Sequence, residues 1–390
     1  MYIVGIDISK FKHDCFIATE TGQVVKDSFS FKNDCNGFND FLNVLKSLDN
    51  TQEIRIGLEA TGHYGSNLKI FLHDNNYNFM EINPVYSERF RQETTLRKTK
   101  TDKIDAKLIA SYILTHEYKT YTLKSYHILA LKSLTRLRFR LIQARTKHKV
   151  RLQNIMDLTF PEYFSIFTDP FGSVSTYLLN NYPSAEKLSK TNFEALYTEI
   201  SRISRNRFAK SKLEKLILLA KNTIGKSNDI YELEIITTMK MITILNEEID
   251  TIENKIVTIM NQYQFKTQTI PGIGIISAAT IVSEFGDFSF FNSPGQMLSF
   301  AGLEPAVYQS GTQNFTGKMV KRGSPYLRYI LMNVSTYVIK YDLTFYNYYR
   351  KKRDSGKQHR VAITHVAKKL LRVIYHLEKT NSIYNSSLLK

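Results

Sequence analysis

The chain has 390 residues, 43% of them hydrophobic, with 53 Lys and Arg against 36 Asp and Glu. This length predicts two or three domains, and the apolar content excludes a wholly disordered protein. No stretch approaches the roughly 18 apolar residues of a membrane span, no signal peptide is visible, and two cysteines are too few for a disulfide framework. We therefore expect a cytoplasmic protein that makes no membrane contact.

The positive charge is unevenly distributed. The formal net charge is +17, and residues 301–390 hold 16 Lys or Arg against 4 Asp or Glu, a local net of +12. Such a concentration favours a polyanionic partner, because each neutralised phosphate releases condensed counterions. An alkaline protein of another kind remains an alternative on charge alone.

Residues 1–120 are predicted to form an α/β domain. Short apolar runs indicate strands at Tyr2–Asp7, His13–Thr19, Val24–Phe31, Ile54–Leu58 and Asn78–Ile82. A helical spacing of apolar residues begins at Phe38. Three antiparallel strands followed by alternating helices and strands is the order of a ribonuclease H-like sheet.

Residues 121–265 are predicted to be helical. One long amphipathic helix begins around Leu129, and a second runs from about Ile230 to Tyr263 with a heptad seam of isoleucines that skips Thr238. An antiparallel arm, a coiled-coil dimer contact and a globular bundle all fit this pattern. The aromatic stretch between them, Pro161 to Pro183, is interpreted as a loop.

Residues 266–390 are predicted to form a mostly helical C-terminal domain that ends in two basic helices. The segment Ile270–Gly274 resembles a helix-hairpin-helix element, whose glycines let backbone amides approach a phosphate. A plain interhelical turn is the alternative. In Tyr337–Arg353, aromatic residues alternate with cations, which suits either stacking on unpaired bases or a helix core.

Four acidic residues fall where an α/β sheet gathers ligands. Asp7 and Glu59 end apolar runs, whereas Asp102 and Asp105 are three residues apart in a segment that Thr101 could cap as a helix. Converging carboxylates would suit two hard divalent cations, which clamp the oxygens of a phosphodiester. Each acid alone could be a helix N-terminal charge or a solvated strand end, but together their order and spacing favour a metal site.

These motifs resemble those of the DEDD transposases of the insertion sequence 110 group, relatives of the Piv-type DNA invertases. The N-terminal matches are GIDISK at Gly5–Lys10, LEATG at Leu58–Gly62 and KTDKIDA at Lys100–Ala106. The C-terminal matches are PGIG at Pro271–Gly274, AGLEP at Ala301–Pro305, QSG at Gln309–Gly311 and KRG at Lys321–Gly323. The helical middle matches only in character.

The resemblance implies a RuvC-like domain that binds Mg²⁺ or Mn²⁺ through the four acids, and a transposase domain with a serine nucleophile. By motif position that serine is Ser310, with Ser299 and Ser324 nearby. It also implies a homodimer or homotetramer, a guide noncoding RNA, and double-stranded donor and target DNA.

The chemistry agrees with that implication. Attack of a serine on phosphorus would conserve the energy of the diester, so that rejoining needs no ATP, and four cations would hold the scissile phosphate and its neighbours: Lys318, Lys321, Arg322 and Arg328. A solvated basic face is the alternative for these cations.

We therefore predict a transposase or site-specific recombinase of an insertion sequence. Two alternatives remain within DNA enzymes: a Piv-type invertase, and a metal-dependent structure-specific nuclease of RuvC type in which Ser310 is structural. A non-enzymatic nucleic-acid scaffold is disfavoured by four suitably ordered acids.

Overall fold

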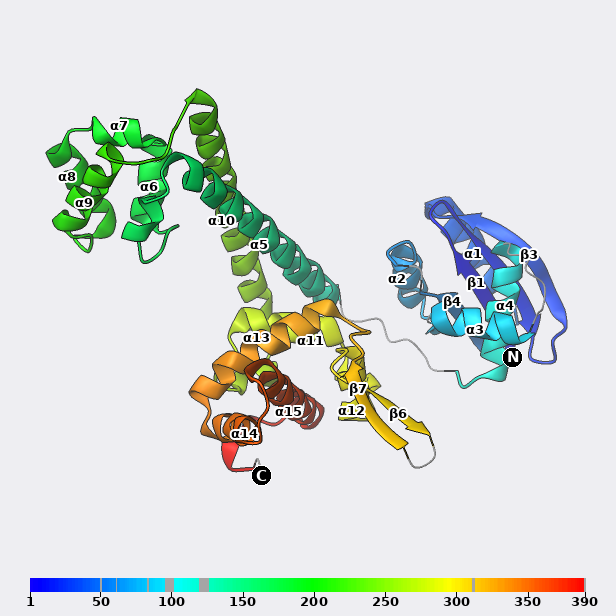
Figure 1. The fold of residues 1–390 in the computed structure, drawn as a ribbon. Helices are drawn as coiled ribbons and strands as arrows, with labels where there is room; N and C mark the ends of the chain where they lie inside the picture. The colour runs from blue at the N-terminus through cyan, green and yellow to red at the C-terminus, as the bar shows by residue number, and fades with distance from the viewer. Residues whose placement is uncertain are drawn as a thin grey trace. The chain divides into compact units, whose positions relative to one another are not determined.

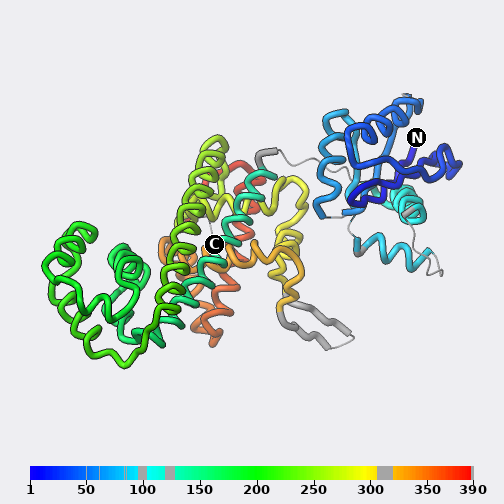
Figure 2. The backbone as a smooth tube through the Cα atoms, turned by 90° about the horizontal axis from the view of Figure 1, so that it is seen from above, coloured from blue at the N-terminus to red at the C-terminus, as the bar shows by residue number. Residues whose placement is uncertain are grey.

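The chain divides into two units, Met1–Tyr126 and His127–Lys390, in a computed structural model. The structure describes residues 1–49, 51–60, 62–82, 84–94, 102–118, 126–310 and 313–388. At residues 85, 102, 126–127, 305–310, 313–318 and 388 it describes the backbone alone. Figure 1 shows the fold, and Figure 2 shows the same backbone from above.

A five-stranded mixed sheet organises the N-terminal unit, in the order β3-β2-β1-β4-β5. The strands are β1 (Tyr2–Ile8), β2 (Lys12–Thr19), β3 (Val24–Lys32), β4 (Ile54–Glu59) and β5 (Phe79–Ile82). The first three are antiparallel, whereas β4 and β5 continue parallel to β1. All five predicted strands are confirmed, and this order is compatible with the expected ribonuclease H-like domain.

Helices cover both faces of this sheet. They are α1 (Cys35–Lys46), α2 (Ser66–Asp74), α3 (Pro84–Thr94) and α4 (Asp102–Thr115). One face buries Ile6 and Leu58 against α1 and α2. The other buries Ile3 against Ala106 and Ile109 of α4. Because successive strand residues point to opposite faces, a residue's position in the strand determines which helices it meets.

The second unit consists mainly of helices. Its first part contains α5 (Tyr126–Thr159), η1 (Tyr163–Ile166), α6 (Ser173–Asn181), α7 (Ala185–Ser189), α8 (Phe193–Ser204), α9 (Lys210–Lys221) and α10 (Asp229–Asn261). Its second part contains η2 (Lys266–Thr269), α11 (Ile275–Phe285), η3 (Phe288–Phe290), α12 (Pro294–Phe300), β6 (Pro305–Ser310), β7 (Gln313–Met319), α13 (Pro325–Tyr341), α14 (Leu343–Asp354), α15 (His359–Thr380) and η4 (Ser386–Leu388). Within the described residues, no helix combines the length and the apolar character needed to cross a bilayer.

Helices α5 and α10 form an antiparallel arm, as Figures 1 and 2 show. Arg138 donates to Glu253 (Nε–Oε1 2.6 Å), and Arg145 donates to Asn246 (Nη1–Oδ1 2.8 Å), so ascending positions on α5 meet descending positions on α10. Thr238, at the position that the isoleucine seam skips, is 4% exposed. The seam therefore continues through this threonine, because its small side chain is packed like its neighbours.

At the far end of the arm lies a helical lobe, here called the distal lobe, which consists of η1 and α6 to α9 (residues 163–221). The sequence analysis did not predict all of its helices. The stretch from Pro161 to Pro183 was interpreted as a loop, which is wrong because it contains α6 and the short helix η1. Its aromatic residues are core residues: Tyr163 is 2% exposed and donates its hydroxyl to the Ser175 carbonyl (3.1 Å). Burial against other helices of the lobe stabilises helices that the local sequence does not signal.

The C-terminal part carries three helices after the β6–β7 hairpin, and not the two predicted. Asp342 separates the first two, because its side chain accepts the Phe345 amide (Oδ1–N 3.0 Å) and caps α14. Tyr384 donates its hydroxyl to the other oxygen of the same carboxylate (2.7 Å). Asp342 therefore stands between the two helices, and its carboxylate caps α14 and binds Tyr384 in the chain after α15.

A buried ion pair joins α5 to α11. Glu284 is 1% exposed, and Arg136 donates to both of its oxygens (Nε–Oε1 2.6 Å and Nη2–Oε2 3.0 Å). Ser324 at the start of α13 donates to the same carboxylate (3.0 Å). Burial alone would raise the pKa of Glu284, but the Arg136 hydrogen bond and the charges of Lys132 and Arg136 outweigh it and lower the pKa.

We expect Glu284→Ala to destabilise the second unit by about 2 kcal/mol, because it removes a buried carboxylate that accepts hydrogen bonds from Arg136 and Ser324. The matched control is Glu253→Ala, which also removes the partner of an α5 arginine but at a side chain that is 33% exposed. That control should cost about 0.5 kcal/mol. Thermal unfolding of the full chain measures both variants, and equal effects would contradict the role assigned to Glu284.

Candidate active site

Asp7 and Glu59 lie at the carboxyl ends of two neighbouring parallel strands. The last pair in the β1–β4 register is Ile6 with Leu58, so the next residue on each strand is one of these acids. Residues in register on adjacent strands point to the same face. Both acids are half-buried. The sheet therefore directs two carboxylates to one side of the same edge.

That side is the one covered by α4, as two glycines show. A Cβ at Gly5 would lie 2.2 Å from the Ala106 carbonyl oxygen, and one at Gly57 would lie 2.2 Å from Ile113 Cδ1. Alternation places Asp7 and Glu59 on the face of these glycines, two residues further along each strand. The glycines thus permit the close approach of α4, and the acids follow where the strands end.

Asp105 shares a small hollow with Glu59. The lining also includes Ser87 and Arg91, both from α3. Ser87 donates its hydroxyl to Glu59 (Oγ–Oε1 2.7 Å). A hydrogen bond to Glu88 raises the pKa of Arg91, and the Asp105 carboxylate adds to that effect. The structure therefore brings together residues from β4, α3 and α4 that are separated widely in the sequence.

The donors of this hollow suit a hard cation. Glu59, Asp105 and Ser87 offer only oxygen atoms, which Mg²⁺ and Ca²⁺ prefer. Asp102 begins α4 one turn before Asp105, but its side chain lies outside the described residues, as does all of Thr101. Among the side chains that are described, no three His, Cys, Asp or Glu residues form a group that could hold a metal ion.

Asp14 is an acidic residue that the sequence analysis missed. It stands opposite Asp7 in the β1–β2 register, so it lies on the same face of the sheet. It is 1% exposed and accepts from Lys12 (2.9 Å) and from Ser30 (2.6 Å). The signal in the sequence is the short connection after Ile8, which fixes the pairing of the two strands.

The serine candidates occupy different environments. Ser310 ends β6 and pairs with Gln313 across the tip of the hairpin, and its side chain is outside the described part of the chain, as are Gly311 and Thr312. Ser299 is exposed on α12. Ser324 caps α13 by accepting the Leu327 amide (3.2 Å) and donates to Glu284, so it has a structural role.

The AGLEP and KRG motifs, on either side of the β6–β7 hairpin in sequence, pack closely against each other through two glycines. Gly302 has φ +65°, and a Cβ there would lie 2.2 Å from the Arg322 carbonyl oxygen. Gly323 has φ +112° and approaches the Phe300 carbonyl equally closely. Arg328 donates to the Ala301 carbonyl (3.3 Å) and so braces this junction. Only glycine tolerates both the positive φ and the contact.

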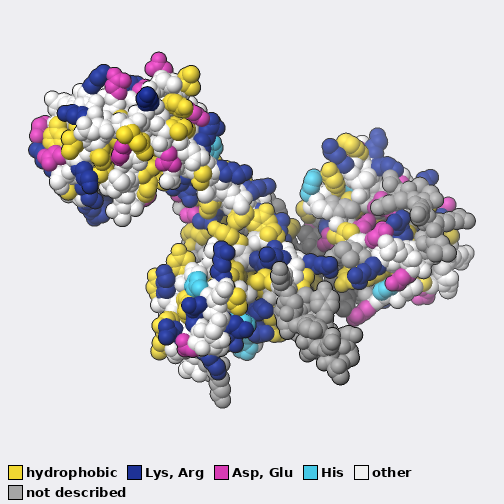
Figure 3. Space-filling model, viewed as in Figure 1, with side chains coloured by type: hydrophobic (Ala, Val, Ile, Leu, Met, Phe, Trp, Pro, Cys, Tyr) yellow, Lys and Arg dark blue, Asp and Glu magenta, His cyan; other side chains and the backbone are white. Residues whose placement is uncertain are grey.

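The remaining predicted cations surround this junction. Lys321 and Arg322 are exposed, whereas the side chain of Lys318 on β7 is not among those described. Figure 3 shows Lys and Arg side chains spread over the C-terminal part and along the arm. The phosphate-binding role of these residues and of Arg328 stays a prediction.

The first glycine of the PGIG segment, Gly272, packs closely against α13. Gly272 has φ +90°, and a Cβ there would lie 2.8 Å from the Val338 backbone nitrogen of α13. Gly274 caps α11, and a Cβ there would meet nothing within 4 Å. An interhelical turn therefore explains Gly272, while the open surroundings of Gly274 still fit approach by a phosphate.

The aromatic residues between Tyr337 and Arg353 have divided roles. Phe345 is fully buried in the core of the second unit, and Tyr348 and Tyr349 pack against that core. Tyr341 and Tyr346 are exposed. Core packing thus accounts for part of the pattern, and only the exposed tyrosines are accessible for stacking on bases.

Two family models match the two ends of the chain. A model described as a transposase, DEDD type, matches residues 4–161, and one described as the transposase IS116/IS110/IS902 family matches residues 266–350. The first range includes the sheet, α4 and all four predicted acids. The second includes Ser310 and the interlocked glycines.

Two similar proteins match nearly the full length of the chain, and a third matches a short segment. The pilin gene-inverting protein of Moraxella bovis is 24% identical over 97% of this chain and 96% of its own. An uncharacterized 44.8 kDa protein of the insertion element IS116 from Streptomyces clavuligerus is 21% identical over 98% and 95%. The transposase for the insertion sequence element IS1111A of Coxiella burnetii is 32% identical over 21% of this chain and 22% of its own.

These likenesses and the acidic edge of the sheet define a DNA transposase, an enzyme of DNA recombination. Both matched regions come from one group of such enzymes, in the order that the motifs predicted. The chain belongs to the IS110 family of transposases.

Proposed function

We propose that this transposase cuts and rejoins double-stranded DNA with a carboxylate metal site in its N-terminal unit and Ser310 as nucleophile. One observation carries the proposal: Asp7 and Glu59 end adjacent parallel strands on the face covered by α4, and Asp105 of α4 lines the same hollow as Glu59. Three acids separated by about a hundred positions in the sequence thus face one side of a sheet edge.

The proposed ligands of Mg²⁺ or Mn²⁺ are Asp7, Glu59, Asp102 and Asp105. The cation would neutralise developing charge on the phosphate oxygens during strand cleavage. Ser87 supports the arrangement, because its hydrogen bond orients one oxygen of Glu59. Asp14, fixed by Lys12 and Ser30, adds negative charge on the same face.

In the proposed covalent step, the Ser310 oxygen attacks phosphorus while the bond from phosphorus to one sugar oxygen breaks. The serine proton leaves to solvent, and the released sugar oxygen takes up a proton. A phosphoserine diester replaces a DNA diester, so attack by another sugar hydroxyl reverses the step without ATP. Lys318, Lys321, Arg322 and Arg328 would bind the phosphates on either side.

The partners follow the same proposal. A structured noncoding RNA would guide the enzyme to donor and target DNA, and the protein would act as a homodimer or homotetramer. The exposed apolar residues of α10 suit contact with a second copy, because Ile230, Leu233, Met241 and Ile244 recur at helical spacing on one side. Sedimentation of the full chain measures its oligomeric state.

A covalent adduct tests this function directly. The full chain is incubated with a nicked duplex that carries the element end, and the protein–DNA product is trapped in detergent and mapped by mass spectrometry. We expect a nucleotide linked to the peptide that contains Ser310. Mapping to Ser299 or Ser324 would reassign the nucleophile, and cleavage without any adduct would support a RuvC-type nuclease instead.

DNA inversion is the second candidate, because a relative that is similar over 97% of this chain is named as a pilin gene-inverting protein. Inversion and transposition use the same strand chemistry and differ in the arrangement of sites. A plasmid with two sites in inverted orientation distinguishes them: inversion of the intervening DNA without mobilisation of an element would favour the invertase.

A further inference from the structure

We propose that a cationic cavity in the distal lobe binds backbone phosphates of nucleic acid. The lobe has a hydrophobic core of its own, closed by α5 and α10. The two family models match residues 4–161 and 266–350, so the whole lobe, residues 163–221, lies outside both. The cavity is therefore a binding site in a part of the chain to which the matched regions assign no role.

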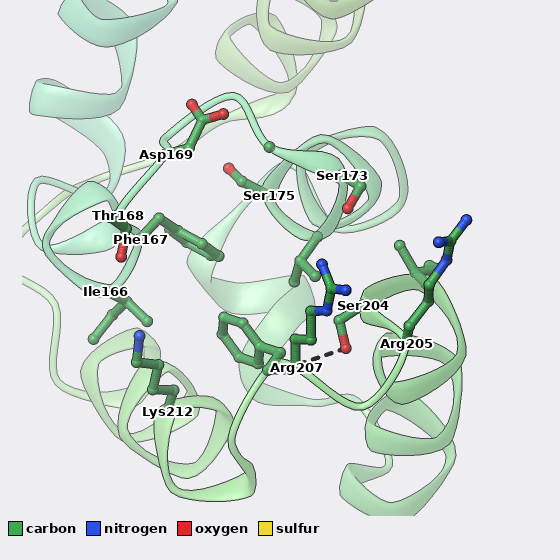
Figure 4. Close-up of a pocket in the computed structure, with 14 residues that line it drawn as sticks. Ile166, Phe167, Thr168, Asp169, Ser173, Ser175, Ser204, Arg205, Arg207 and Lys212 are labelled. Atoms are coloured by element: carbon green, nitrogen blue, oxygen red, sulfur yellow. Dashed lines mark hydrogen bonds between the residues drawn. The ribbon is translucent and has the colours of Figure 1, made fainter.

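The cavity lies between the segment that leads into α6 and the connection from α8 to α9 (Figure 4). Its described lining includes three cations, Arg205, Arg207 and Lys212, and one carboxylate, Asp169. In Figure 4 the Arg207 side chain extends into the hollow, Lys212 rises from α9 at one side, and Arg205 extends outward from the rim. The balance of charge around the opening is positive.

None of these three cations forms an ion pair with a described carboxylate, and the same is true of Lys215 and Lys221 elsewhere in the lobe. Four other cations of the lobe are neutralised: Lys187 by Glu232, Lys190 by Glu186, Arg202 by Glu199 and Lys210 by Glu194. Unpaired cations that gather in one hollow repel one another, and the arrangement becomes favourable when an anion binds. Three of the five unpaired cations of the lobe thus line the cavity, where a ligand can enter.

Neutral groups of the cavity also suit a phosphate. Ser173 is exposed at the first position of α6, and its hydroxyl can donate to an oxygen. Phe167 and Phe208 also line the cavity, with stacked rings whose centroids are 5.8 Å apart, and give it an apolar surface. An arginine fork beside a hydroxyl and a lysine is a donor set that recognises phosphate oxygens.

The phosphate belongs to nucleic acid in this proposal, because the protein is a transposase with a net charge of +17. DNA and RNA share the phosphodiester group, and cations bind this group whatever the base sequence. We therefore expect contacts that add affinity and salt dependence but no sequence preference.

The test compares two double variants of the full chain with equal loss of charge. Arg207→Gln with Lys212→Gln removes two of the three cavity cations, whereas Lys190→Gln with Arg202→Gln removes two ion-paired cations of the same lobe. Fluorescence anisotropy measures binding to a 40-base-pair duplex and to a single-stranded RNA over a series of KCl concentrations. Thermal unfolding confirms that both variants fold.

For the cavity variant we expect affinity at about 0.1 M salt to fall roughly tenfold for each lost contact. The slope of log affinity against log salt should decrease by about 0.9 per contact on the duplex, or about 0.7 on the RNA. The control should retain the wild-type slope. A loss on one nucleic acid alone identifies which one the cavity holds. Equal slopes for the two variants on both nucleic acids would overturn the proposal.

Discussion

Replacing Asp105 by Asn should reduce strand cleavage by about 10³-fold or more at every Mg²⁺ concentration. The substitution keeps the size of the side chain but removes the negative charge that would bind a cation beside Glu59. Neutralising Asp105 also removes one of the two carboxylates that raise the pKa of Arg91, so the hollow becomes more positive and should repel a cation more strongly. Single-turnover cleavage of a labelled substrate measures the effect, and Mn²⁺ should restore little of the rate.

The matched control is Asp27→Asn. Asp27 also contacts α4, through an ion pair with Lys107 (2.8 Å), but its side chain is 72% exposed and lies on β3, away from the strand ends. Cleavage by this variant should stay within about twofold of wild type, because an exposed pair contributes little. A normal rate for Asp105→Asn, with DNA binding intact, would remove the carboxylate from the metal site.

The location of the acidic edge was predictable because it depends on local patterns. Buried strands appear as apolar runs, and an acid that interrupts the end of such a run is conspicuous, as at Asp7 and Glu59. For Asp102 and Asp105 the sequence offered a helix that Thr101 could cap, and the structure has a helix, α4, from Asp102. The strand order brings the ends of β1 and β4 side by side, and this order follows from two hairpins and two parallel crossovers.

Other features depend on tertiary contacts that no local pattern reveals. Asp14 looks like an ordinary strand residue, and only the register with Asp7 places it on the acidic face. Tyr163 looks like a loop residue until the lobe closes over it. Arg328 was expected to bind phosphate, yet its observed partners are backbone carbonyls of the glycine junction, including Ala301. In each case the decisive partner is distant in the sequence.

Replacing Ser310 by Ala should abolish the covalent adduct and lower strand exchange by at least about 10⁴-fold, while DNA binding stays within about twofold. The change removes one oxygen from the tip of the β6–β7 hairpin, where the backbone pairs Ser310 with Gln313, so little of the fold depends on it. A gel assay for the adduct and a plasmid recombination assay measure the two effects separately.

Two neighbouring serines make this prediction specific. Ser299→Ala should behave like wild type, because Ser299 is exposed on α12. Ser324→Ala removes the cap of α13 and a hydrogen bond to Glu284, so it should cost about 1 kcal/mol of stability yet still form the adduct once folded. Strand exchange by Ser310→Ala at a normal rate would exclude this hydroxyl as the nucleophile. Loss of the adduct in Ser324→Ala, with stability otherwise intact, would identify Ser324 as the nucleophile. Its hydroxyl already donates a hydrogen bond to the Glu284 carboxylate.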